Sequence, residues 1–128
     1  MNEISTPLAL FDLLFWIPGI LAALIHVLIF AMESLWWRRP GVRRRFRMSE
    51  ADAEATRVFA FNQGFYNLFL AMGMIVGLAS GRVVLVAFTA SCMLGAAVIL
   101  LVSSRAMWRG AVVQGGPAAL TILALLLR

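Results

Sequence analysis

Residues 62–71, Asn-Gln-Gly-Phe-Tyr-Asn-Leu-Phe-Leu-Ala, decide how this chain folds. Two Asn, one Gln and one Tyr fall within six residues of an otherwise apolar run. Polar side chains inside a membrane span are costly to hold in lipid, and they normally face a protein interior or a water-filled cavity. The run therefore predicts that the neighbouring helices form a bundle around a polar interior.

The composition of the chain is that of an integral membrane protein. Of its 128 residues, 62% are hydrophobic and 13% are charged, whereas a soluble domain is about 45–50% apolar and about 25% charged. The length allows roughly four spans of about 20 residues each with short loops. We therefore predict an all-α, four-helix transmembrane bundle that forms one domain over residues 1–128.

Four apolar segments are long enough to be spans, at about residues 15–37, 58–79, 83–102 and 111–127. Pro18 and Gly19 interrupt the start of the first span, so the residues before Pro18 form either a separate interfacial turn or a kinked extension of the helix. Residues 114–117, Gln-Gly-Gly-Pro, precede or break the fourth span. Gly73 and Gly77 have the spacing of close helix packing, either within one chain or between copies. Before the second span, Ser49 as the N-cap and Asp52 at the capping-box position predict a helix that runs in water for about two turns and then enters the membrane near Val58.

Arginine residues predict how the chain is oriented. Six of residues 38–47 are Arg, which marks the cytoplasmic side. Nine Arg fall on that side and two on the other, namely Arg38, Arg39, Arg43, Arg44, Arg45, Arg47, Arg57, Arg105 and Arg109 against Arg82 and Arg128. We expect both termini outside and anionic lipid headgroups at Arg38–Arg47. The net charge of +5 does not indicate a nucleic-acid partner, because these residues cluster at the membrane edge.

The candidate site lies in the cytoplasmic half of the bundle. His26 and Glu33 are seven residues apart in the first span, about two helical turns, so they share one face. The other spans bring polar side chains to a similar depth: Arg57, Asn62, Gln63, Tyr66, Asn67 and Gln114. The outer half contains mainly Leu, Val, Ala, Gly and Met, so we predict a cavity that opens toward the cytoplasm.

These residue types suit acid–base chemistry on a hydrophobic small molecule. His26, Glu33 and Tyr66 are the candidate catalytic residues, since carboxyl and imidazole groups transfer protons. The candidate substrate-binding residues would orient an oxygen function or stabilise an oxyanion: Asn62, Gln63, Asn67, Gln114 and Arg57. A His–Glu pair without a third ligand does not indicate a metal site, and we expect no cofactor.

Purely structural roles are the alternative for the same residues. Glu33 can pair with Arg38 or Arg57 at the interface. His26 can be satisfied by one hydrogen bond, and the amides can join neighbouring helices.

Three segments resemble a family of small four-helix bacterial membrane proteins of unknown function. They are residues 26–33, His-Val-Leu-Ile-Phe-Ala-Met-Glu, residues 62–71, and residues 114–118, Gln-Gly-Gly-Pro-Ala. The resemblance spans nearly the whole chain. It implies the four-span fold, the same choice of site residues and a location in the bacterial cytoplasmic membrane, and it implies no particular reaction.

A more distant similarity is to the membrane-associated eicosanoid and glutathione enzymes, which are four-helix proteins with Arg and Asn early in the second helix. Arg57, Asn62, Tyr66 and Asn67 resemble that arrangement. Phe65 stands three residues after Asn62, where those enzymes have Glu, so the resemblance does not extend to glutathione binding. It implies a trimer.

Three functions are consistent with this sequence. The first is a membrane enzyme of the isomerase, cyclase or lyase type that acts on a hydrophobic small molecule. The second is a small transporter, coupled to protons through Glu33 and working as a dimer. The third is a structural membrane subunit, in which polar residues only join helices. We expect a homo-oligomer, a dimer or a trimer, because four short helices leave much surface facing lipid.

Overall fold

The computed structural model describes the backbone of residues 5–127 and the side chains of residues 13–127, and within that part every regular element is a helix. Residues 1–4 and 128, which include the expected outer termini, lie outside the described residues. The elements in order are α1 (Ser5–Phe30), η1 (Ala31–Leu35), α2 (Pro40–Arg45), α3 (Glu50–Ala55), α4 (Arg57–Ala79), α5 (Val83–Ser103), η2 (Arg105–Met107) and α6 (Trp108–Leu126).

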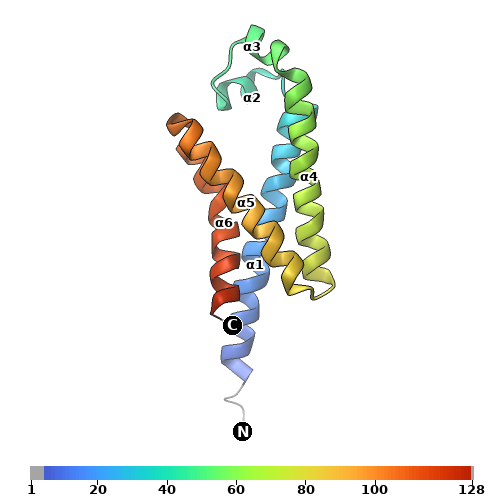
Figure 1. Ribbon diagram of the computed structural model, residues 1–128, viewed down its shortest axis with the longest axis vertical. Coiled ribbons are helices and arrows are strands. Elements are labelled where there is room, and N and C mark those ends of the chain that lie inside the picture. Colours follow the sequence, from blue (N-terminus) through green and yellow to red (C-terminus); the bar gives the residue numbers. More distant parts are fainter. Residues whose placement is uncertain (1–4, 128) are drawn as a thin grey trace.

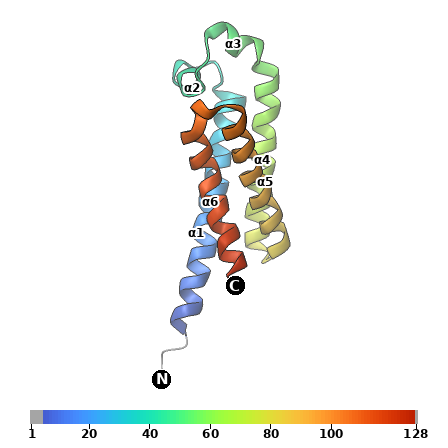
Figure 2. The same cartoon turned by 60° about the vertical axis from the view of Figure 1, so that its left-hand side comes forward.

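Four helical segments are long and apolar enough to cross a membrane: Leu13–Leu35, Arg57–Ala79, Val83–Ser103 and Arg105–Leu126. This confirms the predicted all-α fold with four spans. In Figures 1 and 2, α4 runs beside α1, and α5 and α6 form a second pair. The α5–α6 pair leans away from α1 and α4 at the end that carries α2 and α3 (Figure 1).

The hydrophobic core fills the opposite half of the bundle, where all four long helices meet. Its members are mostly small side chains, which let helix backbones approach closely. The core consists of Phe15, Ala22, Ala23, Ala71, Met74, Leu78, Val86, Ala90, Met93, Ala118 and Ala124. One half of the molecule is therefore tightly closed, while the half near α2 and α3 is splayed.

The predicted interruption at residues 114–117 is wrong, and the residues before Pro18 extend the first helix instead of forming a separate turn. α1 continues through Pro18, and α6 continues through Pro117. Each proline removes only one backbone donor, which a packed membrane helix tolerates. Two glycines near these prolines mark close contacts: a Cβ on Gly19 would lie 3.1 Å from Leu78 Cδ1, and a Cβ on Gly115 would lie 2.6 Å from Ala97 Cβ.

The glycines of the second span serve packing within the chain. A Cβ on Gly73 would lie 2.7 Å from Thr89 Cγ2, and a Cβ on Gly77 would lie 2.9 Å from Val86 Cγ2. Both contacts join α4 to α5. The turn between these helices contains Gly81 with a φ of 66°, a conformation that glycine adopts without strain.

The segment between the first two spans folds into two short helices. The predicted capping box of α3 is confirmed: Asp52 N donates to Ser49 Oγ at 3.0 Å, and Ser49 N donates to Asp52 Oδ2 at 3.2 Å. Hydrogen bonds from the Ser49 side chain and backbone hold the pKa of Asp52 below its ordinary value. The predicted continuation of this helix into the second span is wrong, because α3 ends at Ala55 and a separate helix, α4, begins at Arg57.

Candidate functional site

A cavity of about 450 Å³ lies between the long helices in the splayed half of the bundle. This volume falls within the range of about 300–1,000 Å³ that is typical of small-molecule sites. Most of the wall is apolar, and every long helix contributes to it. The lining residues are Ile25, Leu28, Ile29, Met32, Glu33, Arg45, Phe46, Gln63, Asn67, Ala96, Ile99, Leu100, Ser103, Met107, Gly110, Val113 and Gln114.

Glu33 and Asn67 form a direct contact on the cavity wall. Asn67 Nδ2 donates to Glu33 Oε2 at 2.9 Å and also to the backbone oxygen of Gln63 at 3.0 Å. Asn67 is buried and Glu33 is half-buried. The buried amide therefore fixes the carboxylate across the α1–α4 interface, and both side chains border the cavity.

A π-helical turn sets the direction of Glu33. In η1, the backbone N–H of Trp36 donates to the oxygen of Ala31, five residues earlier, at 2.9 Å. Such turns are rare and are frequent at functional sites. The same turn directs Ser34 toward α4, where Ser34 Oγ donates to the oxygen of Phe61 at 2.9 Å. Two successive side chains of η1, Glu33 and Ser34, are thus bonded to α4.

Gly64 permits the close approach of η1 to α4. A Cβ at this position would overlap Ser34 Oγ and would lie 3.1 Å from the backbone oxygen of Phe30. Any side chain at Gly64 would push the two helices apart, and Glu33 would move away from Asn67. Gly64 is therefore a positioning residue for the pair.

The structure brings four of the eight predicted site residues into this cavity: Glu33, Gln63, Asn67 and Gln114. Asn62 and Tyr66 do not join them. Successive helical residues are separated by about 100°, so Asn62 and Tyr66, each two residues from the buried Gly64, lie on the opposite face of α4. Tyr66 is 61% exposed, and Asn62 Nδ2 donates within its own helix to the oxygen of Val58 at 3.1 Å.

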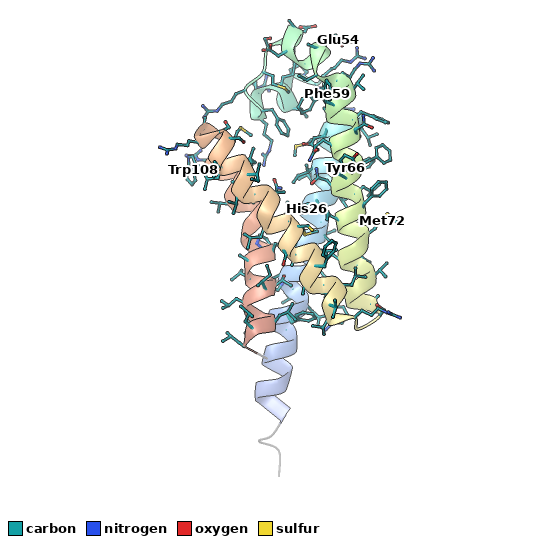
Figure 3. All side chains as sticks on the ribbon, in the orientation of Figure 1. His26, Glu54, Phe59, Tyr66, Met72 and Trp108 are labelled. Atoms are coloured by element: carbon teal, nitrogen blue, oxygen red, sulfur yellow. The ribbon has the colours of Figure 1, made fainter. Side chains whose placement is uncertain are left out.

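His26 lies inside the bundle, about halfway along it (Figure 3), and is fully buried without lining the cavity. Its Nδ1 donates to the oxygen of Ala22 at 2.8 Å. Its Nε2 has no hydrogen-bond partner among the described residues. The seven-residue spacing separates His26 from Glu33 by about 10 Å along the helix, so the expected shared face does not bring the two groups together.

Arg57 faces a separate groove. This groove, of about 780 Å³, runs along the end of the first span and the start of α4, and Glu33 borders it as well. Arg57 Nε lies 3.4 Å from Glu54 Oε1, and Arg38 Nη1 lies 3.4 Å from Glu54 Oε2. Among the described ion pairs, Glu54 rather than Glu33 is therefore the partner of these two arginines.

The connecting segment contributes two cavity-lining residues that were not among the predicted site residues. They are Arg45 and Phe46, at the end of α2. We interpreted the Arg-rich run as an orientation signal, and the fold-back of α2 over the bundle depends on tertiary contacts. The one local signal was Phe46, a single aromatic residue within a run of arginines.

The fold and the cavity define a four-span helical membrane protein with a largely apolar internal site. A family model described as "Protein of unknown function (DUF1304)" matches residues 20–126. Since this match covers most of the chain, the protein belongs to that family, as the resemblance implied. No curated protein and no solved structure matches the chain.

Proposed function

We propose that this protein is a membrane enzyme that performs acid–base chemistry on a hydrophobic small molecule bound in the cavity. One observation carries the proposal: Glu33 and Asn67 form a 2.9 Å hydrogen bond on the wall of a largely apolar cavity. A carboxylate inside a membrane span is energetically costly, and ionisable residues in spans normally mark functional sites. A mostly apolar site with a few converging polar groups is the usual form of a small-molecule site.

The proposal gives each polar side chain of the cavity a role. Glu33 transfers a proton to or from the substrate, and Asn67 fixes its carboxylate. Gln63 and Gln114 orient an oxygen function of the substrate and stabilise negative charge that develops on it. Isomerisation, cyclisation and elimination are the reactions that one carboxylate and three amides suit. His26 and Tyr66 have no role in this scheme because neither lines the cavity.

Solvent deuterium tests the proton transfer even while the substrate is unidentified. Purified protein in lipid nanodiscs is incubated in D₂O with a total lipid extract of the host cells, and the extract is analysed by mass spectrometry. We expect one lipid species to gain deuterium at carbon with the wild-type protein and to gain none with Glu33→Gln. Glu50→Gln is the matched control, because Glu50 is an exposed carboxylate outside the cavity. Labelling that persists in Glu33→Gln would contradict the proposal.

A proton-coupled transporter is the second candidate, and the asymmetry of the bundle favours it. The cavity lies in the splayed half, while the core closes the other half, as in a carrier open to one side. A flux driven by a pH gradient in proteoliposomes, lost in Glu33→Gln, would favour this candidate. If neither flux nor labelling is detected, the structural subunit is the better explanation.

The surroundings of the site extend the proposal. The cavity opens toward the cytoplasm, the Arg38–Arg47 segment contacts anionic lipids, and copies of the chain assemble through the outer face of α4. The exposed Tyr66 supports this assembly, because polar groups in a span are normally covered by protein. The distant similarity to eicosanoid and glutathione enzymes supports a lipophilic substrate. Of the four residues that carry that similarity, Asn67 alone lines the cavity.

A further inference from the structure

Arg45 places a positive charge at the mouth of the cavity. This residue lies at the end of α2 and lines the cavity together with Phe46. Among the described residues, no carboxylate forms an ion pair with it. The other charged residue of the wall, Glu33, is half-buried, whereas Arg45 is exposed, and Glu33 accepts a hydrogen bond from Asn67. Among the described residues, the cavity therefore has a cation without an ion-pair partner at its entrance and, inside, a carboxylate that already accepts a hydrogen bond.

The nearby acidic residues are already engaged elsewhere. Glu50 pairs with Arg43 at 3.0 Å, and Glu54 lies 3.4 Å from both Arg38 and Arg57. Asp52 accepts hydrogen bonds from Ser49 within the capping box. The connecting segment thus has no unused carboxylate to neutralise Arg45, and an external anion is the group that would complete this entrance.

α2 is fixed over the cavity by aromatic and backbone contacts. The ring of Phe46 packs against Trp37 with centroids 5.0 Å apart, and Trp37 Nε1 donates to the oxygen of Ala53 at 3.0 Å. At the end of α2, Met48 N donates to the oxygen of Arg43 at 2.9 Å, which closes a Schellman cap. Arg45 therefore has a defined place above the apolar wall.

The wall beneath Arg45 requires an apolar ligand body. Ile29, Ile99 and Leu100 line the cavity from α1 and α5. A guanidinium binds the planar or tetrahedral oxygens of carboxylate and phosphate groups through paired hydrogen bonds. A ligand that satisfies both regions has a hydrophobic chain and an anionic head.

We propose that the cavity binds a single-chain anionic amphiphile, a fatty acid or an alkyl phosphate, with its head at Arg45 and its chain between α1, α5 and α6. The inference rests on the proposed function in taking this cavity as the substrate site. The chain then passes the Glu33–Asn67 pair, so the reacting carbon lies along the chain and not at the head.

Four probes that share one chain test this assignment. Binding of palmitate, hexadecyl phosphate, hexadecanol and hexadecylamine is measured by native mass spectrometry on the purified full chain in phosphatidylcholine nanodiscs. We expect one of the two anions to bind about tenfold more tightly than the alcohol, the value of one charge-assisted hydrogen bond. The tighter anion identifies the head group, and the amine should bind most weakly.

Variants separate a specific contact from general surface charge. Arg45→Gln should abolish the preference for the anion and leave hexadecanol binding unchanged, while Arg45→Lys should retain part of the preference. Arg44→Gln is the matched control, because Arg44 is the exposed neighbour that does not line the cavity. Retained binding of the alcohol also shows that the Arg45 variants are folded.

Two outcomes would overturn the inference. If the anions and the alcohol bind equally well, the head-group assignment to Arg45 is wrong. If Arg44→Gln loses the preference for the anion as fully as Arg45→Gln does, the preference comes from general surface charge. Neither outcome affects the proposed function, which depends on labelling that requires Glu33. Conversely, anion binding through Arg45 without any deuterium labelling would support the ligand class and contradict the enzyme.

Discussion

At the scale of single residues, the Glu33–Asn67 pair links stability to the candidate site. Replacement of Asn67 by Ala leaves Glu33 Oε2 without its 2.9 Å donor on the cavity wall. Loss of such a partner costs about 1–2 kcal/mol, with membrane interiors at the lower end. We expect Asn67→Ala to lower the free energy of unfolding by this amount, measured by denaturant titration in detergent.

Asn62→Ala is the control for this experiment. Asn62 has the same side chain on the same helix, but it bonds only to Val58 of its own helix and lies on the exposed face. Its removal should change the free energy of unfolding by less than about 0.5 kcal/mol. If Asn62→Ala lowers the free energy of unfolding as much as Asn67→Ala does, the Glu33–Asn67 hydrogen bond does not contribute more to stability than a hydrogen bond within one helix.

Gly64 provides a steric prediction at the same interface. In Gly64→Ala, the new methyl group would overlap Ser34 Oγ and approach the oxygen of Phe30, so the helices must separate. Overpacking of this kind costs about 1–3 kcal/mol, and it should also weaken ligand binding. Gly116→Ala is the comparison, because a Cβ there meets nothing within 4 Å. Thermal unfolding should show a lower Tm for the first variant and an unchanged or higher Tm for the second.

At the scale of elements, the end of α2 contains a strained residue. Arg47 has a φ of 56° at the position after the helix cap, where glycine is the usual residue. Arg47→Gly should therefore raise the free energy of unfolding by about 0.5–1 kcal/mol. Arg44→Gly places the same residue inside α2 and should lower it by about 1 kcal/mol. A loss in both variants would show that the Arg47 side chain itself stabilises the segment.

Local signals in the sequence predicted most of the elements. Apolar length gave the four spans, and Ser49 with Asp52 gave the start of α3. The expected interruptions at Pro18 and at residues 114–117 came from the same cause: proline and glycine were interpreted as possible helix ends, whereas both helices continue, and Gly19 and Gly115 lie at close helix contacts. Packing between helices is a tertiary property, and no local pattern distinguishes it from a break.

The depth of the candidate site along the bundle could be predicted from the sequence, but the helix faces that line it could not. Counting residues from the predicted cytoplasmic side placed Glu33, Gln63, Asn67 and Gln114 at one level, and these four line the cavity. Which face of α4 turns inward depends on contacts such as Gly64 with Ser34, so Tyr66 and Asn62 were indistinguishable from Gln63 and Asn67 by sequence. Arg45 was missed because α2 folds back over the bundle.

At the scale of the whole molecule, the orientation in the membrane decides which compartment supplies the ligand. Among the described residues, the arginine-bearing segments α2, η2 and the start of α4 lie at one end of the bundle, together with the cavity, while Arg82 lies in the turn at the other end (Figure 1). Because Arg-rich loops stay in the cytoplasm, we expect the cavity to open there and the end of α6 to lie outside.

Reporters fused after the last residue test this orientation. An alkaline phosphatase fusion, active only outside the cytoplasm, should be active, and a green fluorescent protein fusion should be dark. Replacing the six Arg of residues 38–47 with Gln should produce a mixed population, because the charge difference between the two sides largely disappears. A fluorescent wild-type fusion would show that the orientation is the reverse of the predicted one. Arg45 would then meet the outer leaflet, and an anionic amphiphile would have to enter from outside the cell.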